Sequence, residues 1–180
     1  MSVHSDAMNK EVQVITICPD KAMAGEKCPV LYLLHGYGGN AGTWLGIKPE
    51  LPQIADKEGI IFVCPDGKNS WYWDSPLNKE YRYETFVSKE LVNYIDKNFT
   101  TKVERGGRAI TGLSMGGHGS LWLSIRHKDV FGGGGSMSGG LDIRPFPNNW
   151  EMKKQLGEEA SNKQRWDEHT VINQLDKIKN

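Results

Sequence analysis

The stretch AITGLSMGGHG, residues 109–119, decides how this chain folds. A short apolar run leads into G-x-S-x-G at 112–116, and a helical pattern follows it. In a strand–turn–helix context, this motif predicts a tight bend that lifts the serine hydroxyl above the carboxyl end of a sheet. Glycines flank the bend because a side chain there would clash. The alternative is a glycine-rich turn with an incidental serine. The context favours Ser114 as a catalytic nucleophile.

The rest of the chain alternates strand and helix patterns, which predicts an α/β fold with a mostly parallel sheet and helices on both faces. Runs of apolar or alternating residues indicate strands at 11–19, 28–36, 59–67, 107–114 and 131–140. Helical spacing of apolar residues indicates helices at 50–59, 83–99 and 115–131. The polar stretch after Leu141 holds two short helical patches and leads towards a strand that the sequence does not reach. We expect one domain over residues 1–180.

Composition excludes several classes of protein. The chain has 22 Lys plus Arg and 22 Asp plus Glu, so it lacks the basic footprint of a nucleic-acid-binding protein. No apolar run approaches the roughly 20 residues that span a bilayer. The N-terminus carries no signal-peptide pattern, which leaves a cytoplasmic protein and an exported one with its signal removed both open. Cys18, Cys28 and Cys64 are expected as buried or half-buried thiols, with one disulfide left open.

A second glycine-rich segment, LLHGYGGN at residues 33–40, follows a predicted buried strand. Such a loop can turn a backbone N–H towards the serine. The N–H groups of Tyr37 and Met115 would then form a two-donor oxyanion hole, in which each donor typically contributes about 10²–10³ in turnover. The alternative is an ordinary turn. His35 is expected to hold the loop rather than to act as a base.

Three adjacent aromatic residues, Trp71, Tyr72 and Trp73, lie in the stretch NSWYWDSP at 69–76. The stretch follows a predicted strand, so we expect it at the catalytic end of the sheet. One or two of these rings are expected to line an acyl or sugar pocket, because flat rings offer contact area at low entropy cost. Packing of the loop onto the domain is the alternative for each ring.

Together these motifs resemble the esterase D-like branch of the α/β-hydrolases, with tributyrin esterase-like enzymes, S-formylglutathione hydrolases, feruloyl and acetyl-xylan esterases and the mycolyltransferases. The resemblance is carried by LYLLHGYGGN, SWYWDSP, YETFVSKELVNYID, GRAITGLSMGGHGSLWL and FGGGGSMSGGLDIRPFP. It implies a three-layer α/β-hydrolase sandwich and an acyl-enzyme esterase with Ser114 as nucleophile, Tyr37 and Met115 as oxyanion donors, and no metal or organic cofactor. Short acyl esters or acyl groups on saccharides are the expected substrates. An S-formylglutathione-type thioesterase and a non-catalytic binding module are the alternatives.

The triad acid and histidine are not evident. The family order is serine, acid, histidine, and each partner follows one of the last strands, so both are expected beyond Asn180, after strands that this chain lacks. We therefore expect a C-terminally truncated and nearly inactive esterase that self-associates through the sheet edge around residues 132–137. Weaker candidates inside the chain are His118, expected behind the bend, Asp167 and His169, too close together in sequence, the surface residues His127 and His4, and Asp142 at the pocket rim.

Overall fold

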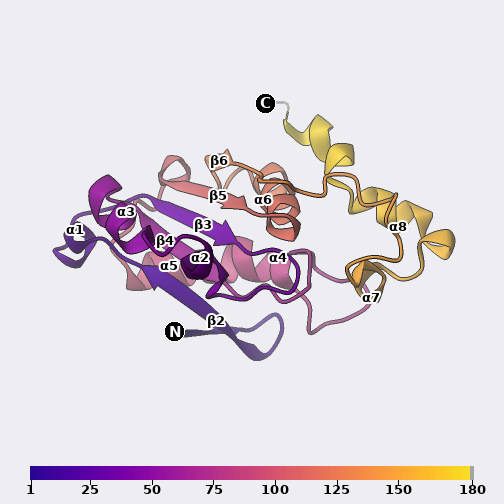
Figure 1. The fold of residues 1–180 in the computed structure, drawn as a ribbon, viewed down its shortest axis with the longest axis horizontal. Coiled ribbons are helices and arrows are strands. Elements are labelled where there is room, and N and C mark those ends of the chain that lie inside the picture. Colours follow the sequence, from indigo (N-terminus) through magenta and orange to yellow (C-terminus); the bar gives the residue numbers. More distant parts are fainter. Residues whose placement is uncertain (179–180) are drawn as a thin grey trace.

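The computed structural model describes residues 1–178, which form a six-stranded mixed sheet with helices on both faces (Figure 1). The strand order is β1-β2-β4-β3-β5-β6. The four strands β3 to β6 run parallel to one another, whereas β2 is antiparallel to both β1 and β4. The strands are β1 (Ser2–Ser5), β2 (Lys10–Ile17), β3 (Val30–Leu34), β4 (Ile61–Pro65), β5 (Arg108–Gly112) and β6 (Gly133–Gly134).

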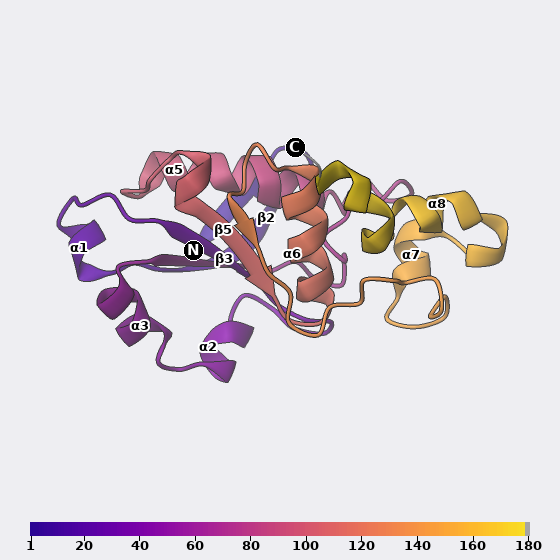
Figure 2. The same cartoon turned by 90° about the horizontal axis from the view of Figure 1, so that it is seen from above.

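The helices cover the sheet in two layers. Figure 2 shows α2 and α3 on one side of the strands and α5 on the other. The α-helices are α1 (Asp20–Met23), α2 (Thr43–Ile47), α3 (Leu51–Glu58), α4 (Tyr83–Thr85), α5 (Val92–Asn98), α6 (Met115–Arg126), α7 (Met152–Leu156) and α8 (Lys163–Glu168). A π-helical segment, Phe86–Leu91, joins α4 to α5, and 3₁₀ turns lie at Arg105–Gly107, Glu159–Ser161 and Val171–Ile178.

Strand β3 shows how the sequence produces these layers. Successive side chains of a strand point to opposite faces. Tyr32 and Leu34 join the larger core cluster, which includes residues of α5 and α6, whereas Leu33 joins a smaller cluster under α2 and α3. The apolar run at 28–36 is therefore buried on both faces, as its composition predicts for a central parallel strand.

The predicted strand at 131–140 forms only in part. Its register with β5 is constant, since Ala109 lies beside Gly133, Ile110 beside Gly134 and Leu113 beside Met137. The segment has few side chains to pack on the sheet, so only two residues form the regular strand β6. Strand β6 ends the sheet order, as expected of a free edge.

The segment after Leu141 extends from one end of the sheet and carries α7 and α8 (Figures 1 and 2). Its last described turn, Val171–Ile178, packs back on α6, and Ile172 N–H donates to Leu141 O. The three cysteines are free thiols, buried at Cys28 and Cys64 and half-buried at Cys18. Every helix among residues 1–178 is too short or too polar to cross a bilayer.

Candidate active site

Ser114 lies at the bend between β5 and α6, with its side chain exposed. Its backbone dihedrals are φ 55° and ψ −114°, a combination that L-residues with a side chain rarely adopt. The conformation is held from outside, because Ser114 N–H donates to Met137 O at 2.8 Å. The predicted bend is therefore present, and it keeps the serine in a strained conformation at the carboxyl end of β5.

The flanking glycines are required by contact distances. A Cβ on Gly116 would stand 2.2 Å from Leu34 O, and one on Gly112 would stand 2.3 Å from Gly116 O. Backbone atoms at such distances cannot give way as a flexible side chain can. The loop after β3 also approaches closely, since a Cβ on Gly36 would lie 3.5 Å from Ser114 Cβ. The two motifs predicted to cooperate thus lie side by side.

Two backbone amides in these motifs lack acceptors. Met115 is the first residue of α6, where an N–H has no carbonyl in the preceding turn of the helix. Tyr37 lies in the turn after β3. Within residues 1–178, no acceptor is found for either N–H. These are the two groups expected to form the oxyanion hole, and the positive end of the 12-residue helix α6 adds to their electrostatic effect.

His35 joins the loop after β3 to the loop after β4. Its ring is buried, and its Nε2 accepts a hydrogen bond from Gly67 N–H at 2.9 Å. Its Nδ1 therefore carries the proton that is donated to Gly36 O at 2.7 Å. Both ring nitrogens are occupied, so His35 has the structural role expected of it.

The three adjacent aromatics differ from the expectation. Trp71, Tyr72 and Trp73 are all buried, with at most 3% of their surface exposed, so none presents a face to a substrate. Trp71 stacks on Trp73 with ring centroids 5.7 Å apart, and the Tyr72 hydroxyl donates to His35 O. Trp71 and Tyr72 both have positive φ angles, and the absence of side chains at Gly67 and Gly119 leaves room for the buried Tyr72 ring. Their placement in a substrate pocket is corrected to packing beneath the loops of the site.

Other aromatic rings are exposed on the segments next to the bend. Tyr37, Phe146 and Trp150 each keep more than 40% of their surface exposed. Phe146 and Trp150 contact each other at 5.3 Å between ring centroids, and Trp150 rests on the buried Trp71. The sequence interpretation missed Phe146 and Trp150. The available signal was two large aromatics in an otherwise polar stretch.

His118, four residues after the serine, is fully buried behind the bend. Trp73 Nε1–H donates to its Nε2 at 2.9 Å, and its Nδ1–H donates to Gly140 O at 2.8 Å. Burial lowers the pKa of His118 to about 4, so the ring is neutral at pH 7. With both nitrogens engaged, His118 cannot accept a proton from Ser114. Its predicted position behind the bend is confirmed.

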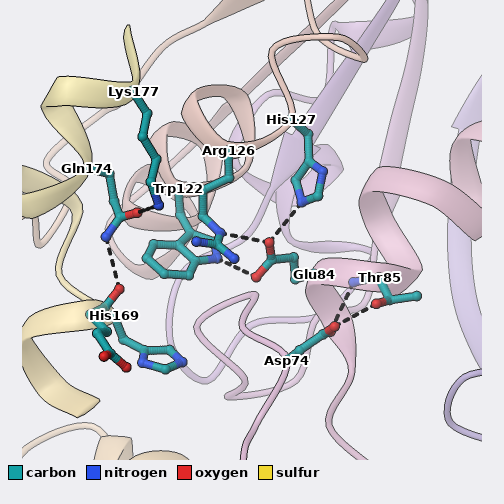
Figure 3. Close-up of a pocket in the computed structure, with 10 residues that line it drawn as sticks. Asp74, Glu84, Thr85, Trp122, Arg126, His127, His169, Gln174 and Lys177 are labelled. Atoms are coloured by element: carbon teal, nitrogen blue, oxygen red, sulfur yellow. Dashed lines mark hydrogen bonds and ion pairs between the residues drawn. The ribbon is translucent and has the colours of Figure 1, made fainter. Parts of the chain in front are cut away.

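A carboxylate–imidazole pair does exist, but at the opposite end of α6. Figure 3 shows Trp122, Arg126 and His127 converging on the Glu84 carboxylate beside a cavity of about 420 Å³. The three donor–acceptor distances are 2.8–2.9 Å. His127 follows Ser114 by 13 residues, which is about 20 Å along a helix. The pair therefore cannot serve the serine, and His127, expected on the surface, is half-buried and bonded.

The remaining candidates for acid and base are also engaged elsewhere. The His169 ring stacks on Trp122 with centroids 5.5 Å apart, and its Nδ1–H donates to Arg165 O. Asp167 and Asp142 both form ion pairs with Arg144. His4 pairs with Glu11. Within residues 1–178, no histidine or carboxylate accepts a hydrogen bond from the Ser114 hydroxyl. Within the same residues, no three His, Cys, Asp or Glu side chains are grouped as a metal site.

Comparison with known proteins agrees with this geometry. A family model described as "Putative esterase" matches residues 5–179. An esterase of Mycobacterium tuberculosis is 33% identical over 132 residues, covering 69% of this chain and 28% of that protein. An acetyl esterase of Caldicellulosiruptor saccharolyticus is 29% identical over 151 residues, covering 79% and 56%.

The fold matches as well. A fluorophosphonate-binding serine hydrolase of Staphylococcus aureus superposes with a TM-score of 0.83 at 20% identity, covering 99% of this chain and 71% of that one. The fold is thus that of the α/β-hydrolases, as predicted. The chain spans 28% to 56% of the length of the curated relatives named above.

Proposed function

The chain belongs to this esterase family, and from that membership we propose that it cleaves carboxylic esters through an acyl-enzyme on Ser114. The observation that carries the proposal is the exposed serine, held at φ 55° beside two amides without acceptors. Backbone strain of this kind persists only where the surroundings enforce it, and it concentrates at functional sites. An incidental serine in a turn would not need such a conformation.

The chemistry follows from the arrangement. The Ser114 Oγ attacks the ester carbonyl carbon, and the electron pair of the C=O bond moves onto oxygen. The Tyr37 and Met115 N–H groups stabilise that oxyanion in fixed positions, without reorganisation at the moment of reaction. Collapse expels the alcohol and leaves the acyl group on Ser114, and water then attacks this ester to release the acid. The hydroxyl proton needs an acceptor, which residues 1–178 do not place at Ser114. The chain on its own therefore acylates slowly.

The proposed substrates are short acyl esters, including acyl groups on saccharides. The exposed rings of Phe146 and Trp150 support this, because they offer flat apolar surface to an acyl chain or a sugar. These rings take the role that was expected of Trp71, Tyr72 and Trp73. An S-formylglutathione-type thioester would use the same serine chemistry.

A fluorophosphonate probe and p-nitrophenyl acetate test the proposal. The probe is expected to modify Ser114, identified by peptide mass mapping, and to leave Ser114→Ala unmodified. Labelling that is equal in the wild type and Ser114→Ala would refute the nucleophile and favour a non-catalytic binding module. Turnover of p-nitrophenyl acetate is expected to be far below that of ordinary esterases. Fast turnover that Ser114→Ala abolishes would show instead that a base lies inside this chain.

A further inference from the structure

The turn that carries the Tyr37 amide is held by side chains from two distant segments. Gly38 N–H donates to Asn69 Oδ1 at 2.8 Å. The other end of the same amide, Asn69 Nδ2, donates to Glu151 Oε2 at 2.9 Å. Desolvation and the nearby Glu151 carboxylate both raise the pKa of the Tyr37 hydroxyl, so the Tyr37 side chain lies beside the same carboxylate. We call Asn69 and Glu151, with these bonds, the Asn69–Glu151 clamp.

The clamp joins two segments that are both held in strained conformations. Lys68, Trp71 and Tyr72 have φ angles of 48° to 60° on one side of it, and Trp150 and Glu151 have 49° and 56° on the other. A second bond joins the same segments, from Trp71 Nε1–H to Trp150 O at 3.1 Å. Left-handed non-glycine residues each cost of order 1 kcal/mol or more, so such a concentration indicates a place where geometry is enforced for function.

The loop needs a restraint from outside because of its composition. Gly36, Gly38 and Gly39 lie within four residues, and Gly38 has φ 76°. Glycine loses the most conformational freedom on folding, so a loop of this kind is mobile unless it is tied. His35 fixes the start of the loop through Gly36 O, and Asn69 fixes Gly38 N–H. The Tyr37 N–H lies between these two fixed points and is itself left without an acceptor.

The charge on Glu151 strengthens the chain of bonds. Hydrogen bonds from Lys154 and then Asn69 lower the pKa of Glu151 below its ordinary value, so the carboxylate is ionised at neutral pH. Bonds to an ionised acceptor are stronger than neutral ones, and linked bonds polarise one another. Asn69 is polarised by Glu151 at one end and accepts the loop amide at the other.

We propose that Asn69 and Glu151 are positioning residues that hold the Tyr37 N–H in place for the oxyanion formed on Ser114. The role rests on the proposed function, because it presupposes that Ser114 is acylated. Neither side chain touches the reacting atoms. Their effect is to keep the amide preorganised, and misplacing such a group by about 1 Å costs up to roughly 10²-fold in rate.

The test measures saturation kinetics of fluorophosphonate labelling and amide hydrogen exchange at Gly38. We expect the variants Asn69→Ala and Glu151→Ala to lower the maximal labelling rate about tenfold, with little change in the probe concentration that gives half the maximal rate. We also expect both variants to speed hydrogen exchange at the Gly38 amide. Glu151→Gln, which keeps an acceptor for Asn69, is expected to recover most of the rate. Lys153→Ala is the matched control, since Lys153 pairs with Glu158 outside the clamp, and is expected to behave as wild type.

The clamp would be overturned if Asn69→Ala labels within twofold of the wild type, or if Gly38 exchange is unchanged in both alanine variants. It would also be overturned if Glu151→Gln is as slow as Glu151→Ala. Thermal unfolding of each variant separates lost positioning from lost folding. If the wild type labels no better than Ser114→Ala, the proposed function fails, while the exchange measurement still decides whether the clamp holds the loop.

Discussion

Replacing Ser114 by glycine is expected to stabilise the protein while removing the proposed nucleophile. At φ 55° and ψ −114°, the residue lies outside even the left-handed helical region that asparagine and aspartate tolerate. Strain of this kind costs about 1–3 kcal/mol. Glycine relieves this strain, but it also increases the conformational entropy of the unfolded chain, which lowers the stability by about 0.4–1 kcal/mol. The net gain expected for Ser114→Gly over Ser114→Ala is therefore about 1 kcal/mol.

The alanine variant is the reference because it removes the hydroxyl and keeps the strained Cβ. Urea unfolding at pH 7 measures the difference, which corresponds to roughly 2–4 °C in the thermal midpoint for a chain of this size. Both variants should lose fluorophosphonate labelling at position 114. If Ser114→Gly is no more stable than Ser114→Ala, the bend does not store strain. The inference from its dihedrals to an enforced catalytic conformation would then fail.

Three further outcomes are expected. Gly116→Ala should lower the free energy of unfolding by about 3 kcal/mol, because its Cβ would stand 2.2 Å from Leu34 O. Gly46→Ala, which has open space around it, should leave the stability unchanged or raise it. Equal unfolding midpoints for the two variants would contradict this. His118 has a folded pKa of about 4, so its contribution to the free energy of unfolding is present above pH 6.5 and is lost as pH falls towards 4, by up to about 3 kcal/mol. The variant His118→Gln should therefore show a flatter dependence of the unfolding free energy on pH over that window. An unchanged slope would refute burial of the neutral ring. Gly133→Lys, at the exposed edge of β6, should reduce a concentration-dependent association seen by light scattering in the wild type; a wild-type monomer at high concentration would count against edge pairing.

The local order of elements was predictable because it depends on short-range patterns. The bend at Ser114 needs a strand, a glycine, a serine and a helix in immediate succession, and all of these are adjacent in sequence. The buried strands at 28–36 and 59–67 were predictable because apolar residues fill both of their faces. Strand β1 carried no such pattern, since only Val3 and Ser5 are buried in it.

The placement of Trp71, Tyr72 and Trp73 was not predictable from local patterns, because the space they fill is made by distant glycines. A Cβ on Gly67 or on Gly119 would lie 2.3 Å from the Tyr72 ring. The tyrosine thus occupies a slot between two segments about fifty residues apart. A glycine at 67 is equally typical of a turn, and one at 119 of close helix packing. Nothing local links them to Tyr72.

The same argument explains why the sequence indicates the reacting groups better than their support. The proposed nucleophile and oxyanion donors lie on main-chain bends whose glycine signatures are compact, so each motif specifies its own conformation. The Asn69–Glu151 clamp joins residues 82 positions apart, and each is an ordinary polar residue where it stands in the sequence. A supporting side chain is chosen for reach and hydrogen-bonding capacity, which many residue types share. Its role becomes visible only when the fold brings its partners within hydrogen-bonding distance.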